Sequence, residues 1–111
     1  MINWSSYEKY NSKNVSNINA VYGVYKLAVL RPENKKRVFY IGSGNIKERL
    51  TAHLSDSEPN TCISNKIEKY ACFFSFKEIQ GGEEKRKKEE QELIKKYQAG
   101  GNAECNKVDS T

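Results

Sequence analysis

Residues 21–53 read VYGVYKLAVLRPENKKRVFYIGSGNIKERLTAH and form the most strongly patterned part of the chain. Two runs, at 21–30 and 37–42, are rich in β-branched and aromatic residues, as β-strands are. The polar segment between them contains Pro32, which suits the second position of a turn. Alternation along the first run puts two sets of side chains on opposite faces of a strand. One set is Val21, Gly23, Tyr25, Leu27 and Val29; the other is Tyr22, Val24, Lys26, Ala28 and Leu30. The pattern predicts an antiparallel hairpin.

The register of this hairpin determines whether its tyrosines meet. Residues that lie opposite each other in an antiparallel pair share a face of the sheet. If Tyr25 lies opposite Tyr40 or Gly42, both phenols project from the same side, whereas a slip of one residue separates them. We predict that Tyr25 and Tyr40 share a face.

A helix is expected directly after the hairpin. Asn45 is a suitable N-cap, and the helix should end near Ser55. Apolar residues at every fourth position form its buried stripe: Ile46, Leu50 and Leu54. Arg49 and His53 are also four residues apart, so they lie one turn from each other at the edge of this stripe. Both side chains are therefore expected beside the end of the hairpin.

The same patterns predict the later elements. A loop at 56–60 (DSEPN) precedes a short helix near 63–70, and the aromatic run ACFFSFKEI (71–79) reads as a third strand. After two glycines a long helix is expected at 83–98, followed by an irregular tail. The predicted fold is a single α+β domain, residues 21–111, in which a small three-stranded antiparallel sheet is flanked by helices.

Residues 1–20 are predicted as an N-terminal arm. Its aromatic residues are spaced by three: Trp4, Tyr7 and Tyr10. Ser5 and Glu8 have the spacing of a capping box, which predicts a short helix. We expect the arm to pack its aromatic rings on the domain; stacking on nucleic-acid bases is the alternative.

The long helix carries a carboxylate whose position needs an explanation. Its apolar stripe consists of Leu93, Ile94 and Tyr97, and Glu90 projects into the same sector one turn earlier. Other charged residues of the helix point away, such as Glu84, Lys88 and Lys95. A carboxylate in line with a buried stripe is unfavourable unless it is paired, protonated or bound to a metal. Either Glu90 has such a partner, or the stripe ends before it and the carboxylate lies in water.

Composition and charge limit the classes of function. The net charge of +5 favours a polyanionic partner. No apolar run approaches the ~20 residues of a membrane span, and the first residues lack a signal-peptide core, so we expect a cytoplasmic protein that does not enter membranes. Cys62, Cys72 and Cys105 are odd in number and lack a CxxC spacing. They are expected to be reduced thiols, rather than a disulfide framework or a zinc site with His53.

Several of these residues together resemble a known family. Gly23-Val24-Tyr25 followed by Tyr40-Ile41-Gly42 is similar to the paired signature of the GIY-YIG nucleases. Arg49 then resembles the helix arginine of that family, and His53 resembles the His or Tyr found one turn later. The resemblance extends from about residue 22 to residue 106.

The end of the chain adds to the resemblance. Glu90 stands three residues before a Leu-Ile pair, as the metal-binding glutamate of the family does. The family has an Asn after this helix, which Asn106 matches best, with Asn102 as the fallback. Gly23 and Gly42 take the places of the motif glycines.

The resemblance implies a metal-dependent DNA endonuclease that hydrolyses phosphodiester bonds. One divalent ion, Mg²⁺ or Mn²⁺, would be held by Glu90, and no other cofactor is implied. Arg49 would bind the phosphate, and His53 would assist by hydrogen bonding or proton transfer. Tyr25 is the favoured base and Tyr40 would orient water or phosphate, although either phenol needs a neighbouring cation to act as a base.

Other functions stay open at this point. Lys26 and Lys47 are expected near the rim of a basic groove that binds DNA. A nucleic-acid-binding module with the same fold and no turnover is the main alternative, and a protein-interaction domain is a third class. Because the chain has room for one domain, any specificity would come from the N-terminal arm, the loops, DNA shape or a partner protein.

Overall fold

The fold is a four-stranded antiparallel sheet between two layers of helices. The computed structural model describes residues 4–55 and 57–109, with the backbone alone at 107–109. The strands run in the order β1-β4-β2-β3, with all pairs antiparallel. Their bounds are β1 Glu8–Lys9, β2 Tyr22–Arg31, β3 Lys35–Asn45 and β4 Cys72–Glu78. The predicted α+β class is confirmed, and the predicted sheet of three strands was one strand too small.

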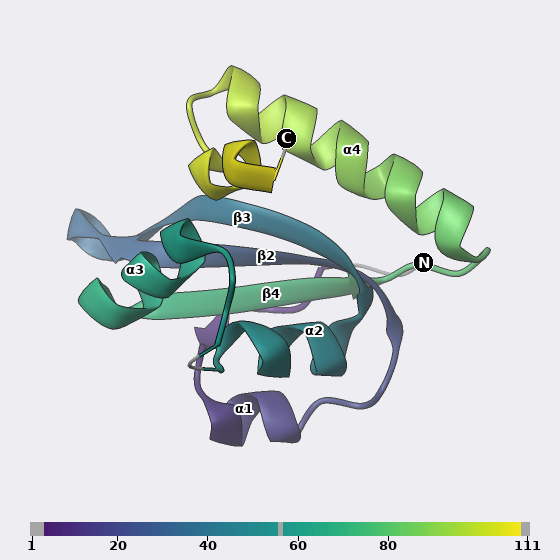
Figure 1. Cartoon of the computed structure of the whole chain (residues 1–111), viewed down its shortest axis with the longest axis horizontal. Helices are drawn as coiled ribbons and strands as arrows, with labels where there is room; N and C mark the ends of the chain where they lie inside the picture. The colour runs from purple at the N-terminus through teal and green to yellow at the C-terminus, as the bar shows by residue number, and fades with distance from the viewer. Residues whose placement is uncertain (1–3, 56, 110–111) are drawn as a thin grey trace.

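Helices cover both faces of this sheet (Figure 1). One face carries α4 and the C-terminal 3₁₀ segment η2, and the other carries α1 and α2. Their bounds are α1 Ser12–Ser16, α2 Ile46–His53, α3 Thr61–Lys69, α4 Glu83–Ala99 and η2 Glu104–Asp109. None of the described helices combines the length and the apolar composition that a membrane crossing needs.

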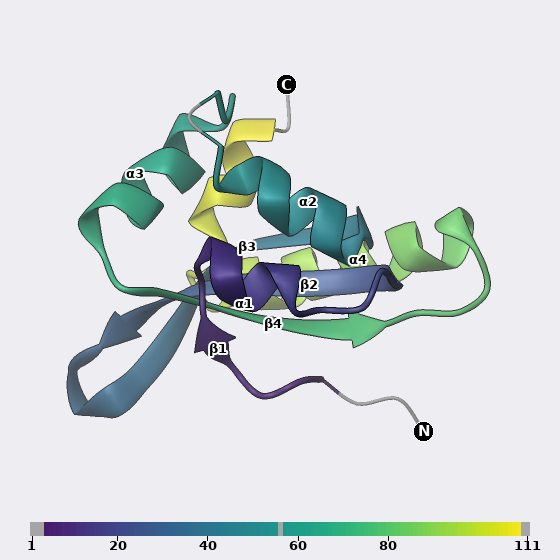
Figure 2. The ribbon, with the colours of Figure 1, turned by 90° about the horizontal axis from the view of Figure 1, so that it is seen from below.

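The β2–β3 hairpin has the register that brings the tyrosines together. Tyr25 lies opposite Gly42 and Leu27 lies opposite Tyr40, so Tyr25 and Tyr40 share a face, as predicted. A bulge follows, because Ala28 pairs with Val38 and leaves one extra residue on β3. The hairpin turns through the 3₁₀ segment η1, Pro32–Asn34, and extends away from the helices (Figure 2).

The two faces of the sheet bury separate apolar clusters. Under α1 and α2 the cluster includes Tyr25, Leu27, Phe39, Leu50 and Phe74. Under α4 the buried residues are Ala28, Val38, Ile41 and Ala103, with Leu93, Ile94 and Tyr97 packed on them. The predicted stripe of α4 therefore faces the sheet, because an amphipathic helix gains stability by burying its apolar side.

Residues within 4–20 pack closely on the rest of the chain. Glu8 and Lys9 pair with β4 and add the fourth strand, which satisfies backbone groups that an open edge would leave unpaired. The helix predicted at Ser5 is wrong: α1 begins later, where the side chain of Asn11 accepts from the N–H of Asn14. Tyr10 is buried, and its hydroxyl donates to the carbonyl oxygen of Leu50 at 2.6 Å. The arm thus packs its aromatic rings on the domain, as expected; residues 1–3 lie outside the described part.

The expectation of three free thiols is wrong for two of the cysteines. Cys62 and Cys105 form a disulfide, with Cα atoms 5.3 Å apart, while Cys72 is a buried free thiol. The two partners are 43 residues apart in sequence and meet because η2 packs against the start of α3. Bonds of this kind are typical of oxidising surroundings, so the cytoplasmic location stays a prediction.

Candidate active site

Seven residues from four elements line one open pocket of about 470 Å³. They are Tyr25 of β2; Tyr40, Gly42 and Ser43 of β3; Arg49 of α2; and Lys87 and Glu90 of α4. Because β3 is an edge strand, side chains from the α2 face and from the α4 face meet around its edge. The topology therefore joins groups that belong to opposite layers of the molecule.

Three aromatic rings pack together on the α2 side, where Tyr25 and Tyr40 line the pocket and His53 lies behind them. The ring centroid of Tyr25 lies 6.3 Å from that of Tyr40 and 5.8 Å from that of His53, and the Tyr40 and His53 centroids are 5.3 Å apart. The hydroxyl of Tyr25 is 2.7 Å from Nε2 of His53. Tyr25 is 0% exposed and His53 3% exposed, so this hydrogen bond is shielded from water.

The two motif glycines are explained by close approaches. A Cβ added to Gly42 would lie 2.3 Å from the hydroxyl of Tyr25, because the phenol occupies the space above this residue. A Cβ added to Gly23 would lie 2.0 Å from the carbonyl oxygen of Lys77 on the neighbouring strand. Gly23 thus permits strand pairing, and Gly42 permits the position of Tyr25.

Gly42→Ala should therefore displace the phenol of Tyr25 and separate it from His53. If the protein has the nuclease activity that its sequence resemblance implies, DNA cleavage should fall on the order of 10²-fold, since a misplacement of about 1 Å at a reacting group has this effect. Overpacking should also lower the free energy of unfolding by about 1–3 kcal/mol. Cleavage rates and thermal melts test both effects. Gly100→Ala is the control, because an added Cβ there meets neighbours only at 3.6 Å. Wild-type cleavage by Gly42→Ala would show that the position of Tyr25 is unimportant.

The surroundings of Tyr25 oppose its ionisation. Burial raises the pKa of Tyr25 well above its ordinary value, and the neighbouring Tyr40 raises it further. The guanidinium of Arg49, which hydrogen-bonds the phenol, lowers this pKa by less. Arg49 therefore favours the phenolate, as a neighbouring cation should, but burial outweighs its effect on the pKa of Tyr25. If Tyr25 acts as a base, its hydroxyl must give its own proton to a neighbouring group while it accepts a proton from the water.

Glu90 lies in the apolar sector of α4 and has polar partners there. Its side chain is 16% exposed, and Oε1 accepts from the hydroxyl of Ser43 at 2.7 Å. The ammonium group of Lys87 is 3.6 Å from the same oxygen. The interpretation that the stripe ends before Glu90 and leaves it in water is wrong.

These groups are compatible with one weakly held divalent ion. Mg²⁺ keeps several waters and is commonly bound by one or two carboxylates together with phosphate oxygens of a substrate. Glu90 is the one carboxylate among the lining residues that the structure describes. Among the side chains of residues 4–55 and 57–106, no cluster of three or more His, Cys, Asp or Glu is present. Lys87 competes with such an ion for the same oxygen.

Five predicted site residues do not line this pocket: Gly23, Lys26, Lys47, His53 and Asn106. Lys26 projects toward α4, where its ammonium lies 4.1 Å from the ring centroid of Trp4 and 3.5 Å from the hydroxyl of Tyr97. Lys47 is in the first turn of α2 and is not among the lining residues. The side-chain amide of Asn106 binds both backbone groups of Ile41, at 2.8 and 2.9 Å, so it attaches η2 to the edge of β3.

Sequence patterns missed three polar residues around the site. Lys87 stands one helical turn before Glu90, so helical spacing would have pointed to it. Ser43 directly follows the second tripeptide. Glu58 contacts His53, with Oε2 2.9 Å from Nδ1, and no local pattern marks it.

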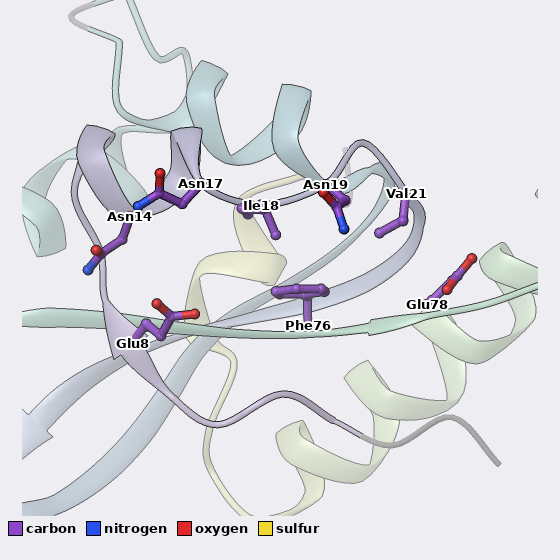
Figure 3. Close-up of a pocket in the computed structure, with 8 residues that line it drawn as sticks. All are labelled: Glu8, Asn14, Asn17, Ile18, Asn19, Val21, Phe76 and Glu78. Atoms are coloured by element: carbon purple, nitrogen blue, oxygen red, sulfur yellow. The ribbon is translucent and has the colours of Figure 1, made fainter.

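A second hollow lies elsewhere and suits a phosphate poorly. It has a volume of about 390 Å³ and lies between α1 and the edge of β4 (Figure 3). Phe76 and Ile18 face each other inside it, and Glu8 and Glu78 lie near its ends. Two carboxylates repel an anionic substrate, and this hollow shares no residue with the pocket around Tyr25.

No family model, curated protein or solved structure matches the chain. The functional argument therefore depends on the geometry of the pocket and on the residues that form it.

Proposed function

We propose that the protein is a metal-dependent DNA endonuclease of the GIY-YIG type. The proposal is supported mainly by one observation: Tyr25, Tyr40, Arg49 and Glu90 line the same pocket. Each of them singly has an ordinary structural explanation as a strand tyrosine or a surface charge. An open pocket that collects a guanidinium, two phenols and a partly buried carboxylate suits the hydrolysis of a phosphodiester.

Arg49 is the phosphate-binding residue in this proposal. Arg49 is an exposed residue of α2, and its guanidinium hydrogen-bonds the phenol of Tyr25. The guanidinium therefore lies between solvent and the buried aromatic rings. A guanidinium has five N–H donors and binds phosphate oxygens in two places as charge develops. When Arg49 turns toward a bound phosphate, the hydroxyl of Tyr25 becomes accessible from the pocket.

Glu90 is the residue that would hold Mg²⁺ or Mn²⁺. A bound ion of this kind polarises the phosphoryl group and stabilises the leaving oxygen. Ser43 fixes the orientation of the carboxylate, and Lys87 lends positive charge near the phosphates. Tyr25 accepts a proton from the attacking water, and Tyr40 borders the water or phosphate on the same wall.

The direct test is cleavage of supercoiled plasmid, single-stranded and branched DNA with Mg²⁺ or Mn²⁺. Nicking that stops on chelation supports the proposal. DNA binding without cleavage of any form would favour the binding-module alternative. The ion pair between Lys87 and Glu90 is the observation that favours this alternative, because it occupies the proposed metal ligand. Absence of both activities would favour a protein-interaction domain.

DNA binding should weaken steeply as salt rises, because phosphate contacts release counterions. For about four phosphate contacts, the affinity should fall roughly 10²-fold between 50 and 200 mM salt. Fluorescence anisotropy with a labelled duplex measures the slope. Lys87→Gln should reduce this slope by about one contact. Lys95→Gln, an equal charge change on the exposed side of α4, is the control. Salt-independent binding would contradict a phosphate-binding groove.

A further inference from the structure

Two short hydrogen bonds link three side chains behind the pocket. The hydroxyl of Tyr25 is 2.7 Å from Nε2 of His53, and Nδ1 of the same ring is 2.9 Å from Oε2 of Glu58. The side chains of His53 and Glu58 are only 3% and 6% exposed. The three groups therefore form a continuous buried chain, from the pocket wall to the loop between α2 and α3.

The loop that carries Glu58 is held in place at several points. The other carboxylate oxygen of Glu58, Oε1, accepts a hydrogen bond from the backbone N–H of Asn60 at 3.1 Å. Asn60 in turn caps α3 through its side-chain oxygen and donates to the carbonyl oxygen of Cys105 at 3.2 Å. Backbone and capping contacts therefore hold the carboxylate of Glu58 in its position facing the imidazole.

The hydrogen-bonding capacities of the three groups give the chain a direction. An ionised carboxylate only accepts hydrogen bonds, so Nδ1 of His53 must carry a proton and donate it to Glu58. In the neutral ring Nε2 is then the acceptor, so the hydroxyl of Tyr25 donates to it. The imidazole is ready to take the proton of the phenol.

We propose that Glu58 is a positioning residue that acts through His53 and allows Tyr25 to serve as the base of the reaction. The inference rests on the proposed nuclease function. In the step, an O–H bond of the attacking water breaks and its proton goes to the hydroxyl oxygen of Tyr25. The O–H bond of Tyr25 breaks as its proton passes to Nε2 of His53, while Nδ1 keeps its proton. The resulting hydroxide attacks phosphorus, the bond from phosphorus to the leaving oxygen breaks, and that oxygen takes a proton from solvent water; His53 later returns its extra proton to solvent.

This arrangement answers the difficulty that burial creates for Tyr25. Burial disfavours a phenolate of Tyr25 that forms before the reaction. When the proton of Tyr25 passes to His53 during the reaction, the imidazolium that forms is a cation beside the developing negative charge. Glu58 stabilises that imidazolium. Other ionisable groups near His53 in the described part of the chain are Tyr40 of β3, Arg49 of its own helix and Glu68 of α3, which lines a small hollow against the ring. The carboxylate of Glu58 is hydrogen-bonded to the imidazole.

The chain contains a single histidine, so the state of its ring is measurable without assignment. A long-range ¹H–¹⁵N correlation spectrum of the free wild-type protein, recorded across the titration of the ring, should show the neutral form with its proton on Nδ1. A neutral ring with its proton on Nε2 would reverse the direction of transfer and overturn the inference. Because this measurement needs no DNA, its outcome is independent of whether the protein cleaves.

Glu58→Gln tests the effect on the reaction. The substitution keeps the shape of the side chain and an acceptor for Asn60, but removes the negative charge that favours the imidazolium. We expect the maximal cleavage rate to fall on the order of 10²-fold, with little change in DNA affinity. The acid limb of the pH profile should also move to lower pH, because the ring is harder to protonate without the carboxylate.

Glu68→Gln is the matched control, since it changes the net charge equally on an exposed residue beside the same ring. It should leave both rate and pH profile unchanged. If Glu58 merely holds the loop, Glu58→Gln will lower the melting temperature without moving the acid limb, and the inference fails. If the wild type cleaves no DNA while its neutral ring carries the proton on Nδ1, the proposed function fails and the hydrogen-bonded chain stands.

Discussion

Glu90→Ala is expected to abolish Mg²⁺-dependent cleavage, with a loss of at least about 10³-fold. Among the described residues this carboxylate is the only one that lines the pocket, so its removal takes away the proposed protein ligand of the ion. Stability should hold or rise slightly, because an unfavourable charge leaves an apolar sector while one hydrogen bond from Ser43 is lost. DNA binding without metal should survive or tighten, since a negative charge near the phosphates is gone. A plasmid-nicking time course and anisotropy titrations measure these effects.

Two further variants sharpen this test. Glu90→Asp should also be poor, because the shorter side chain moves the ligand by about one methylene. Glu84→Ala, on the exposed side of the same helix, should change almost nothing. Cleavage by Glu90→Ala at the wild-type rate with Mg²⁺ would show that the metal role is assigned to the wrong residue.

Tyr25→Phe should reduce cleavage by a similar factor for a different reason. The ring would keep its place in the core, but the oxygen that receives the proton of water would be absent. Nε2 of His53 would lose its buried partner, which costs about 1–3 kcal/mol of stability. Single-turnover cleavage at saturating enzyme separates this loss of chemistry from a loss of binding.

Tyr22→Phe is the control for Tyr25→Phe, because Tyr22 lies on the opposite face of β2 and is 51% exposed. Its activity should equal that of the wild type. Tyr40→Phe should have a smaller effect than Tyr25→Phe, since in the proposed reaction Tyr25 is the residue that accepts the proton of the attacking water. If Tyr40→Phe is the more damaging variant, the two phenols exchange roles in the proposal.

The secondary structure was largely accessible from local patterns. Alternation along β2, the Asn45 cap and the stripe of α4 predicted elements that the structure contains at those places. These signals are local because backbone hydrogen bonding and side-chain periodicity act within a few residues. The N-terminal helix was misplaced by the same logic. Its capping spacing at Ser5 was overridden by the pairing of Glu8 and Lys9 with the edge of β4.

Part of the candidate site could be predicted from the sequence. Tyr25, Tyr40, Arg49 and Glu90 could be selected from motif order and helical phase, and they line one pocket. Lys26 was expected at the rim of this pocket and instead lies toward α4, although its place on the opposite strand face was visible in the alternation. Proximity in sequence to a motif residue is not proximity in space when side chains alternate.

Local sequence was therefore sufficient for three of the four strands, for helix phase and for the faces on which the tyrosines lie. Three features arise only from contacts between distant segments: the edge position of β3, the Cys62–Cys105 disulfide and the contact of Glu58 with His53. The edge position joins groups from opposite faces of the sheet into one pocket. The disulfide and the Glu58 contact require the packing of α3, its preceding loop and η2, which no periodicity encodes, because packing depends on the shapes of surfaces that meet only in the folded chain.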